Sequence, residues 1–528
     1  MRKIALFAVA VLNAPLAVGR EHVLPFVFRS TSMSAALRHF NHLAILGCTL
    51  GMASVCQGQN AFSPGGVEYP IAGSLPGDQT FPNAVIRTNA GYLVWQDNAT
   101  DGDGLGIRAQ RLDGNLNKIG APFRVNAIGT WDQERPQLAP LSNGGAVFVW
   151  QGGKQGFQKI YARFLPATGT NFATSDILVN TYTNNFQSHP CVTTLLDGSV
   201  VVIWASFGQD GYLQGIFGQR LSSTGAKVGG EFQVNQYPLN NQRTPSVAAL
   251  AGGGFVAVWV SELQRGLSTV DIYARMFDNS GTAAGNEFPV NTVLTNICAN
   301  PVVVGSPDGG FMVAWSQRDV VSGNTSSSQF STTIVSNPSS NSWDVYGRVF
   351  SAAGVATTAP VRMNTLAYGD QYGPKISAFG KNYLATWLSL GRDGSMEGIY
   401  GQFLSGAAEL AGVEFQVNIG NASRQIDQSV CSDGVNRFLV TWSSYATSGS
   451  FDLFARSYEL IRVDIVPSAQ GVKLTWNTRP GGTYQVQSSA DYSNWVNFGA
   501  ARVATGHSDS VDIASAPNMT VYRVVRIY

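Results

Sequence analysis

Charged residues are scarce in this sequence. Lysine, arginine, aspartate and glutamate make up 13% of the 528 residues, and the formal net charge is +1. Without residues 1–58 the chain has 29 basic and 32 acidic residues, a net charge of −3. A nucleic-acid-binding protein would show a basic bias, and a charged interaction tail would show a run of like charge. The sequence favours neither class, and we expect no nucleic-acid partner.

Histidine and cysteine are also rare. Beyond residue 58 the histidines are His189 and His507, in different predicted domains. This pattern excludes a multi-histidine metal site and limits any histidine-based catalytic triad to one of the two. Cys191, Cys298 and Cys431 remain after the same cut. An odd number spread over separate repeats favours buried thiols over a disulfide framework.

Long hydrophobic runs are missing. The two apolar stretches, Ile4–Val18 and Leu43–Val55, fall short of the roughly 20 residues of a membrane-spanning helix. We therefore predict that residues 1–58 are a leader with a signal peptide and that the mature chain is secreted or held at the cell surface, with no transmembrane span.

The leader leaves alternatives open. Met33 is an alternative translation start, which would make residues 33–58 the signal peptide. A membrane anchor is another alternative. Lipoprotein processing at Cys48 or Cys56 is a third, because each follows an apolar run.

Sustained helical periodicity is absent beyond the leader. Tryptophan instead recurs at an almost constant spacing, and each one closes an apolar run such as Phe255–Trp259. The series is Trp95, Trp150, Trp204, Trp259, Trp315, Trp387 and Trp442, with steps of 55, 54, 55, 56, 72 and 55 residues. A period of this length made of short strands is typical of a blade array, and seven units can close into a ring. The sequence predicts an all-β fold, a seven-bladed β-propeller.

Each repeat contains four strand signals in a fixed order. The first follows a Gln and usually a Pro, as in Gln242–Leu250, and the second is the run that ends in Trp. The third is typified by Ile216–Leu221 and the fourth by Glu231–Asn235. Short strands between Gly, Asn and Asp turns are typical of an all-β repeat and leave no room for a helical one.

The fourth strand indicates how the ring would close. Its copies end at Asn126, Asn180, Asn235, Asn291, Asn364 and Asn418. A degenerate copy, Val67–Ala72, precedes the first Trp repeat, and none follows the seventh. We therefore predict that the propeller covers residues 67–458 and that its N-terminal strand completes the last blade, which would remove an open sheet edge.

Residues 461–528 form a separate predicted module. Val472–Trp476 and Thr483–Ser488 alternate like strands, and Pro480–Gly482 forms a turn between them. Several short strands in a segment of this size predict a small β-sandwich of fibronectin type III kind.

The repeat reads Glu-Phe-x-Val-Asn, Gln-x-x-Pro, Val-Trp and Ile-Tyr-Gly-Gln-Arg across roughly residues 67–458. This pattern resembles the tandem propeller repeats of large secreted and surface proteins of environmental bacteria. The tail, Gly482–Asp491 with Asn494 and Trp495, is similar to terminal sandwich modules of secreted bacterial proteins, often of Verrucomicrobia type. The resemblance implies an extracellular scaffold or adhesion role and supplies no catalytic motif.

Two sets of polar residues recur from repeat to repeat, which is more typical of structural hydrogen bonds than of a ligand site. One set is Gln79, Gln133, Gln187, Gln242, Gln371 and Gln428. The other, in the third strand, is Gln110, Arg163, Gln219, Arg275, Arg348, Gln402 and Arg456. We expect the first set to be structural hydrogen-bonding residues, and the second set, with the Trp series, to pack blade on blade.

Acidic residues gather in one Gly-rich loop, Asp97–Gly104. Asp97, Asp101 and Asp103 could bind Ca²⁺ together, because Ca²⁺ favours several oxygen ligands. The alternative is turn chemistry, because Asp-Gly pairs tolerate positive φ. Calcium is the only cofactor that the sequence suggests.

The repeat breaks in the fifth unit. Trp315 and Val345, where the third strand starts, are 30 residues apart, against 10–13 in the other units. Strand polarity puts this long loop on the face where the loops linking one blade to the next arrive. Candidate ligand-binding residues on that face are Trp131, Tyr182, Phe186, His189, Tyr237, Phe330, Trp343, Tyr368 and Tyr372. Aromatic side chains on such loops can stack on sugars or peptides. The alternative is a surface insertion beside solvent-tolerated aromatics, with His189 an ordinary loop residue.

These features favour a secreted or cell-surface recognition or scaffold protein without catalytic activity, one that binds an extracellular glycan or another surface polymer through one propeller face. One alternative is a polysaccharide-active hydrolase or lyase, because propellers carry enzymes as readily as binders. A glycosidase needs two positioned carboxylates, and nothing in the spacing selects such a pair. Another alternative is a structural element of a surface assembly.

Overall fold

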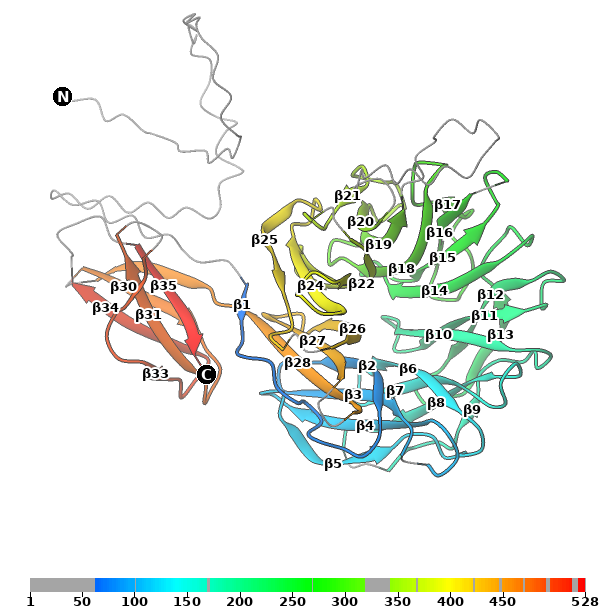
Figure 1. Cartoon of the computed structure of the whole chain (residues 1–528), viewed down its shortest axis with the longest axis horizontal. Helices are drawn as coiled ribbons and strands as arrows, with labels where there is room; N and C mark the ends of the chain where they lie inside the picture. The colour runs from blue at the N-terminus through cyan, green and yellow to red at the C-terminus, as the bar shows by residue number, and fades with distance from the viewer. Residues whose placement is uncertain are drawn as a thin grey trace, which may run out of the picture.

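The computed structural model describes residues 62–99, 101–168, 171–267, 269–318, 342–366, 369–420, 423–445, 449–468, 471–490, 494–514 and 521–527. These residues contain strands and turns but no helix, so none of them belongs to a helix able to cross a membrane. The all-β class is therefore confirmed. Repeated four-stranded antiparallel sheets of β-propeller type make up the larger part of the chain, as Figure 1 shows.

The repeated part consists of four-stranded units that follow the chain. The first three are β2 (Gln79–Ile86), β3 (Ala90–Asp97), β4 (Gly106–Asp113) and β5 (Lys118–Arg124); β6 (Gln133–Pro140), β7 (Ala146–Gly152), β8 (Lys159–Leu165) and β9 (Ile177–Leu178); and β10 (Gln187–Thr194), β11 (Val200–Phe207), β12 (Gln214–Leu221) and β13 (Lys227–Gln233). The fourth and fifth, joined by one parallel bridge, are β14 (Gln242–Ala249), β15 (Phe255–Glu262), β16 (Val270–Phe277) and β17 (Phe288–Pro289); and β18 (Ile297–Gly305), β19 (Phe311–Arg318), β20 (Trp343–Phe350) and β21 (Val361–Arg362). The sixth is β22 (Gln371–Phe379), β23 (Asn382–Leu390), β24 (Glu397–Leu404) and β25 (Leu410–Gln416), and the last contains β26 (Gln425–Ser432), β27 (Arg437–Tyr445) and β28 (Phe451–Leu460).

The tryptophan series packs one unit against the preceding one, as predicted. Trp204 of β11 is fully buried in a cluster with Val147 and Val149 of β7. Trp259 packs in the same way against Val201 of the third unit. Trp95 of the first unit shares its cluster with Leu439, which belongs to the last unit. Burial of these large apolar surfaces between sheets is the main force that holds the units together.

An asparagine–glutamine pair links most neighbouring units. Asn126 accepts a hydrogen bond from the Ile107 backbone N–H at 2.8 Å and donates one to Gln133 Oε1 at 2.7 Å. Asn180, Asn235, Asn364 and Asn418 repeat this arrangement with Gln187, Gln242, Gln371 and Gln425. The structural role expected for the repeated Gln is confirmed.

One member of that predicted set was misplaced. Gln425, not Gln428, occupies the repeat position of the last unit, because this position lies three residues before a buried residue, which is Pro in the other units and Gln428 in the last. Gln428 donates instead to the Gly373 carbonyl at 2.6 Å. In the fifth unit the position holds Cys298, which is buried.

The Arg and Gln residues of the third strand divide into two roles. Arg163 donates to the Val125 carbonyl of the preceding unit at 2.7 Å, and Arg275 does the same to Val234 at 3.0 Å. Gln110 and Gln219 bind carbonyl groups within their own units. The longer guanidinium groups thus reach across to the preceding unit, so the expected contact between units is confirmed for Arg163 and Arg275 and stays a prediction for the Gln residues.

The N-terminal segment joins the last unit. β1 (Phe62–Pro64) pairs antiparallel with β28, and Tyr69 forms one further bridge to Ala455. The predicted strand at Val67–Ala72 therefore contributes a single bridge, and most of the pairing lies upstream of it. Glu68 accepts hydrogen bonds from the backbone N–H groups of Ile419 and Gly420, at 2.6 and 2.9 Å.

Three free thiols occur among the described residues. Cys298 is buried, whereas Cys191 and Cys431 are only partly buried. The absence of a disulfide in this part of the chain agrees with the prediction, but full burial holds for one cysteine of the three.

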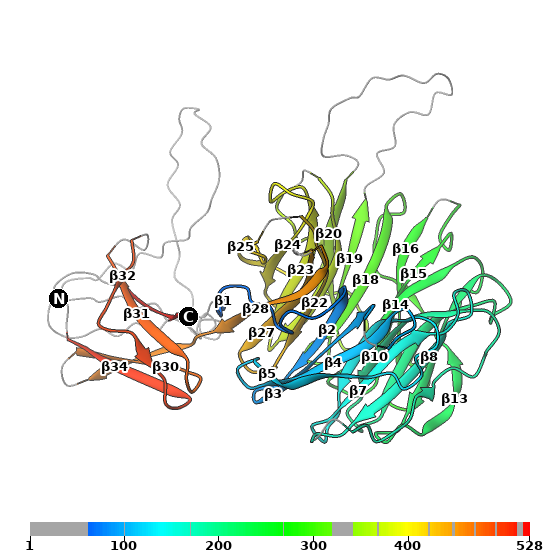
Figure 2. The ribbon, with the colours of Figure 1, turned by 60° about the horizontal axis from the view of Figure 1, so that its bottom comes forward.

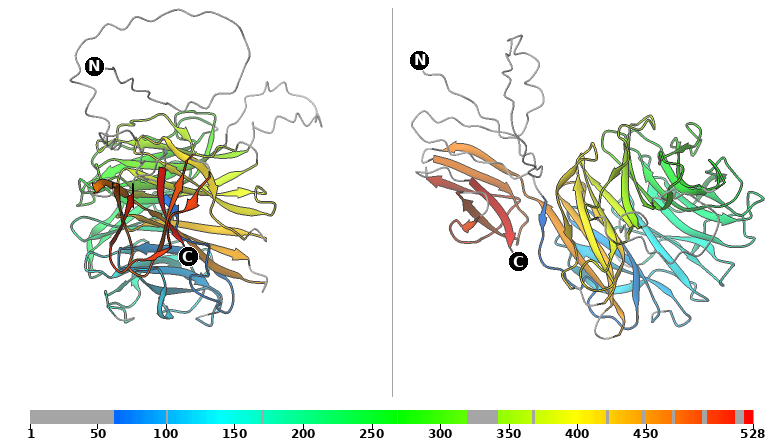
Figure 3. Two further views of the ribbon diagram at one scale, coloured as in Figure 1. Left: turned by 90° about the vertical axis from the view of Figure 1, so that its left-hand side faces the viewer. Right: turned by 45° about the horizontal axis from the view of Figure 1, so that its top comes forward.

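The C-terminal module consists of two antiparallel sheets. They are built from β29 (Val463–Ser468), β30 (Gly471–Asn477) and β34 (Ser508–Ala514), and from β31 (Thr483–Ser489), β32 (Val496–Asn497), β33 (Arg502–Val503) and β35 (Val521–Ile527). Their core includes Leu474, Trp476, Tyr484 and Val524. The module lies beside the units that contain β1 and β28, as Figures 2 and 3 show.

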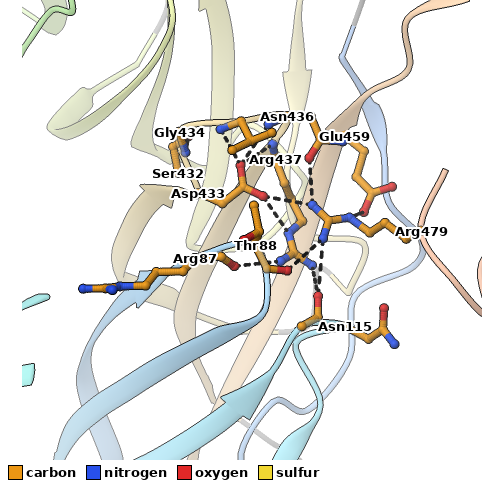
Figure 4. A network of polar contacts seen from close by, with 12 residues as sticks. Arg87, Thr88, Asn115, Ser432, Asp433, Gly434, Asn436, Arg437, Glu459 and Arg479 are labelled. Carbon is orange, nitrogen blue, oxygen red and sulfur yellow. Dashed lines mark hydrogen bonds and ion pairs between the residues drawn. The ribbon is translucent and has the colours of Figure 1, made fainter. Parts of the chain in front are cut away.

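Buried ionic contacts join this module to the repeated part. Arg479 donates to Asp433 at 2.9 Å and to Asn436 at 2.8 Å in the β26–β27 turn (Figure 4). The same guanidinium pairs with Glu459 at 2.9 Å and reaches the Gly114 carbonyl of the first unit at 3.4 Å. One side chain therefore contacts the first unit, the last unit and its own module.

Candidate functional site

A cavity of about 560 Å³ lies where the first strands of the units meet. Its walls come from β2, β6, β10, β14, β18, β22 and β26. We call it the axial cavity. The first strands contact one another in chain order, and β26 also contacts β2.

Every first strand carries a β-bulge at the cavity. The residue at each bulge has a positive φ: Phe81 (52°), Arg135 (52°), His189 (54°), Thr244 (49°), Asn300 (51°), Gly373 (64°) and Asp427 (55°). For a residue with a Cβ this conformation costs roughly 1–2 kcal/mol, so the surrounding sheets must impose it. The following residue is buried in each unit, and it is Pro in six of them.

The bulge position combines a constant backbone with different side chains. The seven residues include an aromatic ring, a guanidinium, an imidazole, a hydroxyl, an amide, no side chain and a carboxylate. Each bulge lies near the start of its first strand, at the end of the sheet where the segment from the preceding unit enters. In the first unit, Gln79 begins β2 at this end and pairs with Asp97, the last residue of β3. We call this the linker end. A scaffold that repeats while its cavity residues vary is typical of a recognition site.

Charged groups face the cavity from three units. Burial raises the pKa of Asp427 most, while the Phe81 N–H, at 3.4 Å from Oδ2, and the charge of Lys375 lower it. The Lys375 side chain is open to the cavity but ringed by protein, and this loss of bulk water lowers its pKa. Asp427 raises the pKa of Lys375, and Arg135 lowers it, so the three charges are close enough to interact.

His189 is uncharged at neutral pH. Burial, together with the positive charges of Arg135 and Arg243, lowers its pKa to about 4. Its Nδ1 lies 3.2 Å from Ser188 Oγ, and its backbone N–H donates to Gln151 Oε1 at 2.9 Å.

Part of the cavity wall is held by a chain of two hydrogen bonds across three units. Ser429 donates to Asn83 Oδ1 at 3.2 Å, and Asn83 donates to Gln137 Oε1 at 2.7 Å. These hydrogen bonds connect the last, first and second units. Because the three polar side chains already bind one another, the neighbouring charged side chains are the groups available to a ligand.

Two of the predicted ligand-binding residues, His189 and Tyr372, line the axial cavity. The Tyr372 hydroxyl donates to Glu397 Oε1 at 3.3 Å, and burial raises the pKa of Tyr372 to about 12.

Trp131 lines a different, smaller cavity of about 200 Å³ between the first two units, with Trp150, Tyr161 and Asp176. Its ring is 52% exposed, and the Lys154 ammonium lies 5.9 Å from the ring centroid. Trp131 is the most exposed of the predicted aromatic candidates that the structure describes.

The remaining predicted residues do not gather into one surface. Tyr182 donates to the Gly208 carbonyl at 3.4 Å, Phe186 stacks on Phe207 at 5.2 Å, and Tyr237 donates to the Leu263 carbonyl at 3.4 Å. Each of these rings thus packs on a loop of its own unit. Trp343 is partly buried at the start of β20. Phe330 and Tyr368 lie outside the described residues.

The three aspartates proposed for calcium serve separate partners. Asp97 accepts from the Ala99 N–H at 2.9 Å, Asp101 from Asn126 Nδ2 at 3.0 Å, and Asp103 from the Trp131 N–H at 3.1 Å. Within the described residues no three His, Cys, Asp or Glu side chains are grouped to hold a metal ion. Calcium in this loop stays a prediction.

The residues that the sequence analysis missed are Arg135, Lys375, Asp427, Thr244 and Asn300, all of which line the axial cavity. The sequence signal was weak, because the residue just before the repeated Pro differs in every repeat but so does the residue before it. The Pro that follows the bulge marks Arg135, Thr244 and Asn300, but it is absent after Asp427 and does not point to Lys375.

No protein-family model matches this chain, and no curated protein sequence matches it. Among solved structures, a Dyadobacter fermentans protein of unknown function is 11% identical, with 62% of this chain and 95% of that chain covered and a TM-score of 0.43. An ulvan lyase, described as a new family of polysaccharide lyase, is 9% identical, with 73% and 94% covered and a TM-score of 0.45. An α-L-arabinofuranosidase of Fusarium graminearum is 12% identical, with 61% and 92% covered and a TM-score of 0.42. Likeness at this level carries no statement about activity or ligand.

Proposed function

We propose that this protein is a secreted or cell-surface recognition protein, without a catalytic role, that binds an extracellular glycan or another surface polymer at the linker end of its axial cavity. The observation that carries the proposal is the ring of seven bulges, where one strained backbone conformation presents seven different residues to the cavity. Backbone strain that recurs around a cavity favours a ligand site over a purely structural role. The exposed ring of Trp131 supplies a stacking surface at the same end.

Gly373 offers a test of cavity occupation. A Cβ built on Gly373 meets no atom within 4 Å, and the six sister positions carry side chains at a similar φ. We expect Gly373→Phe to fold and to reduce the affinity for a glycan identified on a glycan array by about tenfold or more, because the ring fills ligand space. Gly373→Ala has the same backbone restriction without the ring and should bind nearly as the parent does.

Equal affinity of Gly373→Phe and the parent, with intact circular dichroism, would remove the axial cavity from the binding account. Failure of every glycan and surface polymer to bind would overturn the recognition proposal itself.

An enzymatic function is the second candidate, because the uncharged His189 and the ionisable Tyr372 and Asp427 share the axial cavity with two cations. A reducing-sugar release assay on the polysaccharides that bind distinguishes the two candidates. Binding without release supports recognition, whereas release that is lost in His189→Ala supports a polysaccharide-active hydrolase or lyase.

We further propose that the four-stranded units are seven blades of a closed ring. Support comes from the shared cluster of Trp95 and Leu439, from the pairing of β1 with β28, and from Glu68. Glu68 binds backbone N–H groups of the sixth unit, as Glu231 and Glu287 do in their own preceding units.

Removal of residues 59–74 tests the closure. We expect the melting temperature to fall by more than about 5 °C, because β28 loses its outer partner and buried Ile71 and Ala72 are lost from the core. A chain that lacks only residues 1–58, the predicted leader, is the control. An unchanged melting temperature would mean that each blade is built from contiguous sequence.

A further inference from the structure

Two cations of the axial cavity have no ionic partner among the described residues. Arg135 lies over the face of Phe81, 5.1 Å from the ring centroid, and forms no ion pair within 4.0 Å. Lys375 also forms none within that distance, and its side chain is open to the cavity. A cation that faces a cavity without an ionic partner keeps its N–H donors available to a bound anion.

Neighbouring arginines show the arrangement that these two cations lack. Arg243, whose charge acts on His189, pairs with Glu262 at 2.7 Å. Arg424, whose charge acts on Asp427, pairs with Glu397 at 2.7 Å. The structure therefore neutralises the basic groups around the cavity and leaves those inside it free.

The acidic side chain of Asp427 balances only one of the two basic side chains, Arg135 and Lys375. It is the one acidic side chain among the described residues that line the cavity, and it accepts a hydrogen bond from the Phe81 N–H at 3.4 Å. Two basic side chains, Arg135 and Lys375, therefore face the cavity against one acidic side chain, Asp427.

Neutral polar groups stand on another side of the cavity. Thr244 lines the cavity, but its Oγ1 is buried and closed to a ligand. Asn300 is exposed to the cavity from the adjacent unit. A ligand that satisfied both regions would carry an anionic group together with neutral hydroxyl groups, which is the chemistry of an acidic sugar.

We propose that the axial cavity binds an acidic saccharide, with Arg135 and Lys375 holding its anionic group and Asn300 binding a hydroxyl group. This inference rests on the proposed recognition function and names the ligand class for the same site. The shared chemistry is a carboxylate or a sulfate ester on a sugar ring, and Arg is suited to either because its planar fork donates two parallel hydrogen bonds.

Titration calorimetry of the full chain with three tetrasaccharides tests the proposal. The probes are tetragalacturonate, which carries carboxylates, a κ-carrageenan tetrasaccharide, which carries sulfates, and neutral galactotetraose. We expect one of the two acidic probes to bind, with the affinity falling about 10- to 100-fold in Arg135→Gln and in Lys375→Gln. Asp427→Asn should bind more tightly than the parent, because it removes the opposing charge while keeping an acceptor for the Phe81 N–H.

Lys118→Gln, on the exposed outer strand β5, is the matched control and should leave the affinity unchanged. Arg135→Lys keeps the charge but not the fork, and an intermediate affinity would confirm direct contact with the anion.

Equal binding of acidic and neutral probes, or unchanged affinity in folded Arg135→Gln and Lys375→Gln, would overturn the acidic-saccharide proposal. If a neutral glycan binds and Gly373→Phe abolishes that binding, recognition in the cavity stands and this inference alone fails. If Gly373→Phe leaves the affinity unchanged, recognition in the axial cavity and the acidic-saccharide proposal both fail.

Discussion

Trp204→Ala is expected to lower the free energy of unfolding by about 3–5 kcal/mol, the usual loss when a large buried aromatic residue is truncated. The Trp204 side chain is 0% exposed and packs between the second and third units, against Val147 and Val149. Its removal leaves a cavity at the junction of two sheets, and neither sheet can move to fill it without separating from its other neighbour. Chemical denaturation followed by tryptophan fluorescence and by circular dichroism measures the effect.

Trp131→Ala is the control for that experiment, because its ring is 52% exposed and lies on a loop. We expect less than about 1 kcal/mol for this variant, as for most surface substitutions. A loss below about 1 kcal/mol in Trp204→Ala would contradict the role assigned to the whole tryptophan series.

Asp433→Asn is expected to destabilise the protein by about 3–5 kcal/mol, because it leaves buried arginines without their counter-charge. Asp433 pairs with Arg479 at 2.9 Å and with Arg437 at 3.7 Å, and the Arg437 side chain is only 1% exposed (Figure 4). Its carboxylate also accepts backbone N–H groups of Val435 and Asn436 at 2.9 Å. The loss should affect the last unit, the first unit and the C-terminal module together, since Arg437 and Arg479 both reach the Gly114 carbonyl.

The matched control is Asp509→Asn, which breaks the more exposed pair with Arg502. Exposed pairs contribute about 0–1 kcal/mol, so this variant should unfold close to the parent. Equal effects of Asp433→Asn and Asp509→Asn would show that the buried network adds nothing beyond a surface ion pair.

Asp433 also predicts a pH dependence. Burial alone would raise the pKa of Asp433, but the N–H groups of Asn436, Val435 and Arg437 and the Arg437 charge outweigh it and leave the pKa below its ordinary value. A carboxyl with a lowered folded-state pKa stabilises the fold above its unfolded pKa of about 3.9 and loses that contribution as pH falls through the folded value. Stability should therefore decrease below about pH 4 in the parent and less steeply in Asp433→Asn, as measured by melting temperature against pH.

The tryptophan series and the Asn–Gln pairs could be predicted from the sequence because they recur at a fixed period. Burial of an apolar run such as Val200–Phe207 depends only on local composition and on contact with the neighbouring unit. The error at Gln428 has a physical cause. The last repeat lacks the Pro that marks the bulge elsewhere, so the alignment shifted by three residues to the next Gln.

The candidate site was harder to predict than the fold. Loop aromatics such as Tyr182 and Phe186 looked accessible in the sequence, but each finds a packing partner in its own unit. The cavity residues lie within strands. The alternation of apolar and polar residues predicts which strand face is buried, but it does not predict which side chains face the axial cavity. A bulge shifts the register, and only a folded sheet shows which way the shifted side chain points.

The sequence by itself determined the all-β class, the four-stranded repeat and the residues that hold one unit to the next, because each depends on short-range periodicity and on burial between adjacent repeats. Only the tertiary structure decided which side chains share the axial cavity. Phe81 and Asp427 are 346 residues apart in the chain yet hydrogen-bonded, and Arg135 and Lys375 come from units that do not adjoin. Charges that far apart in sequence interact only when the first strands converge, since the contact depends on how the sheets are arranged around the cavity and not on any local pattern.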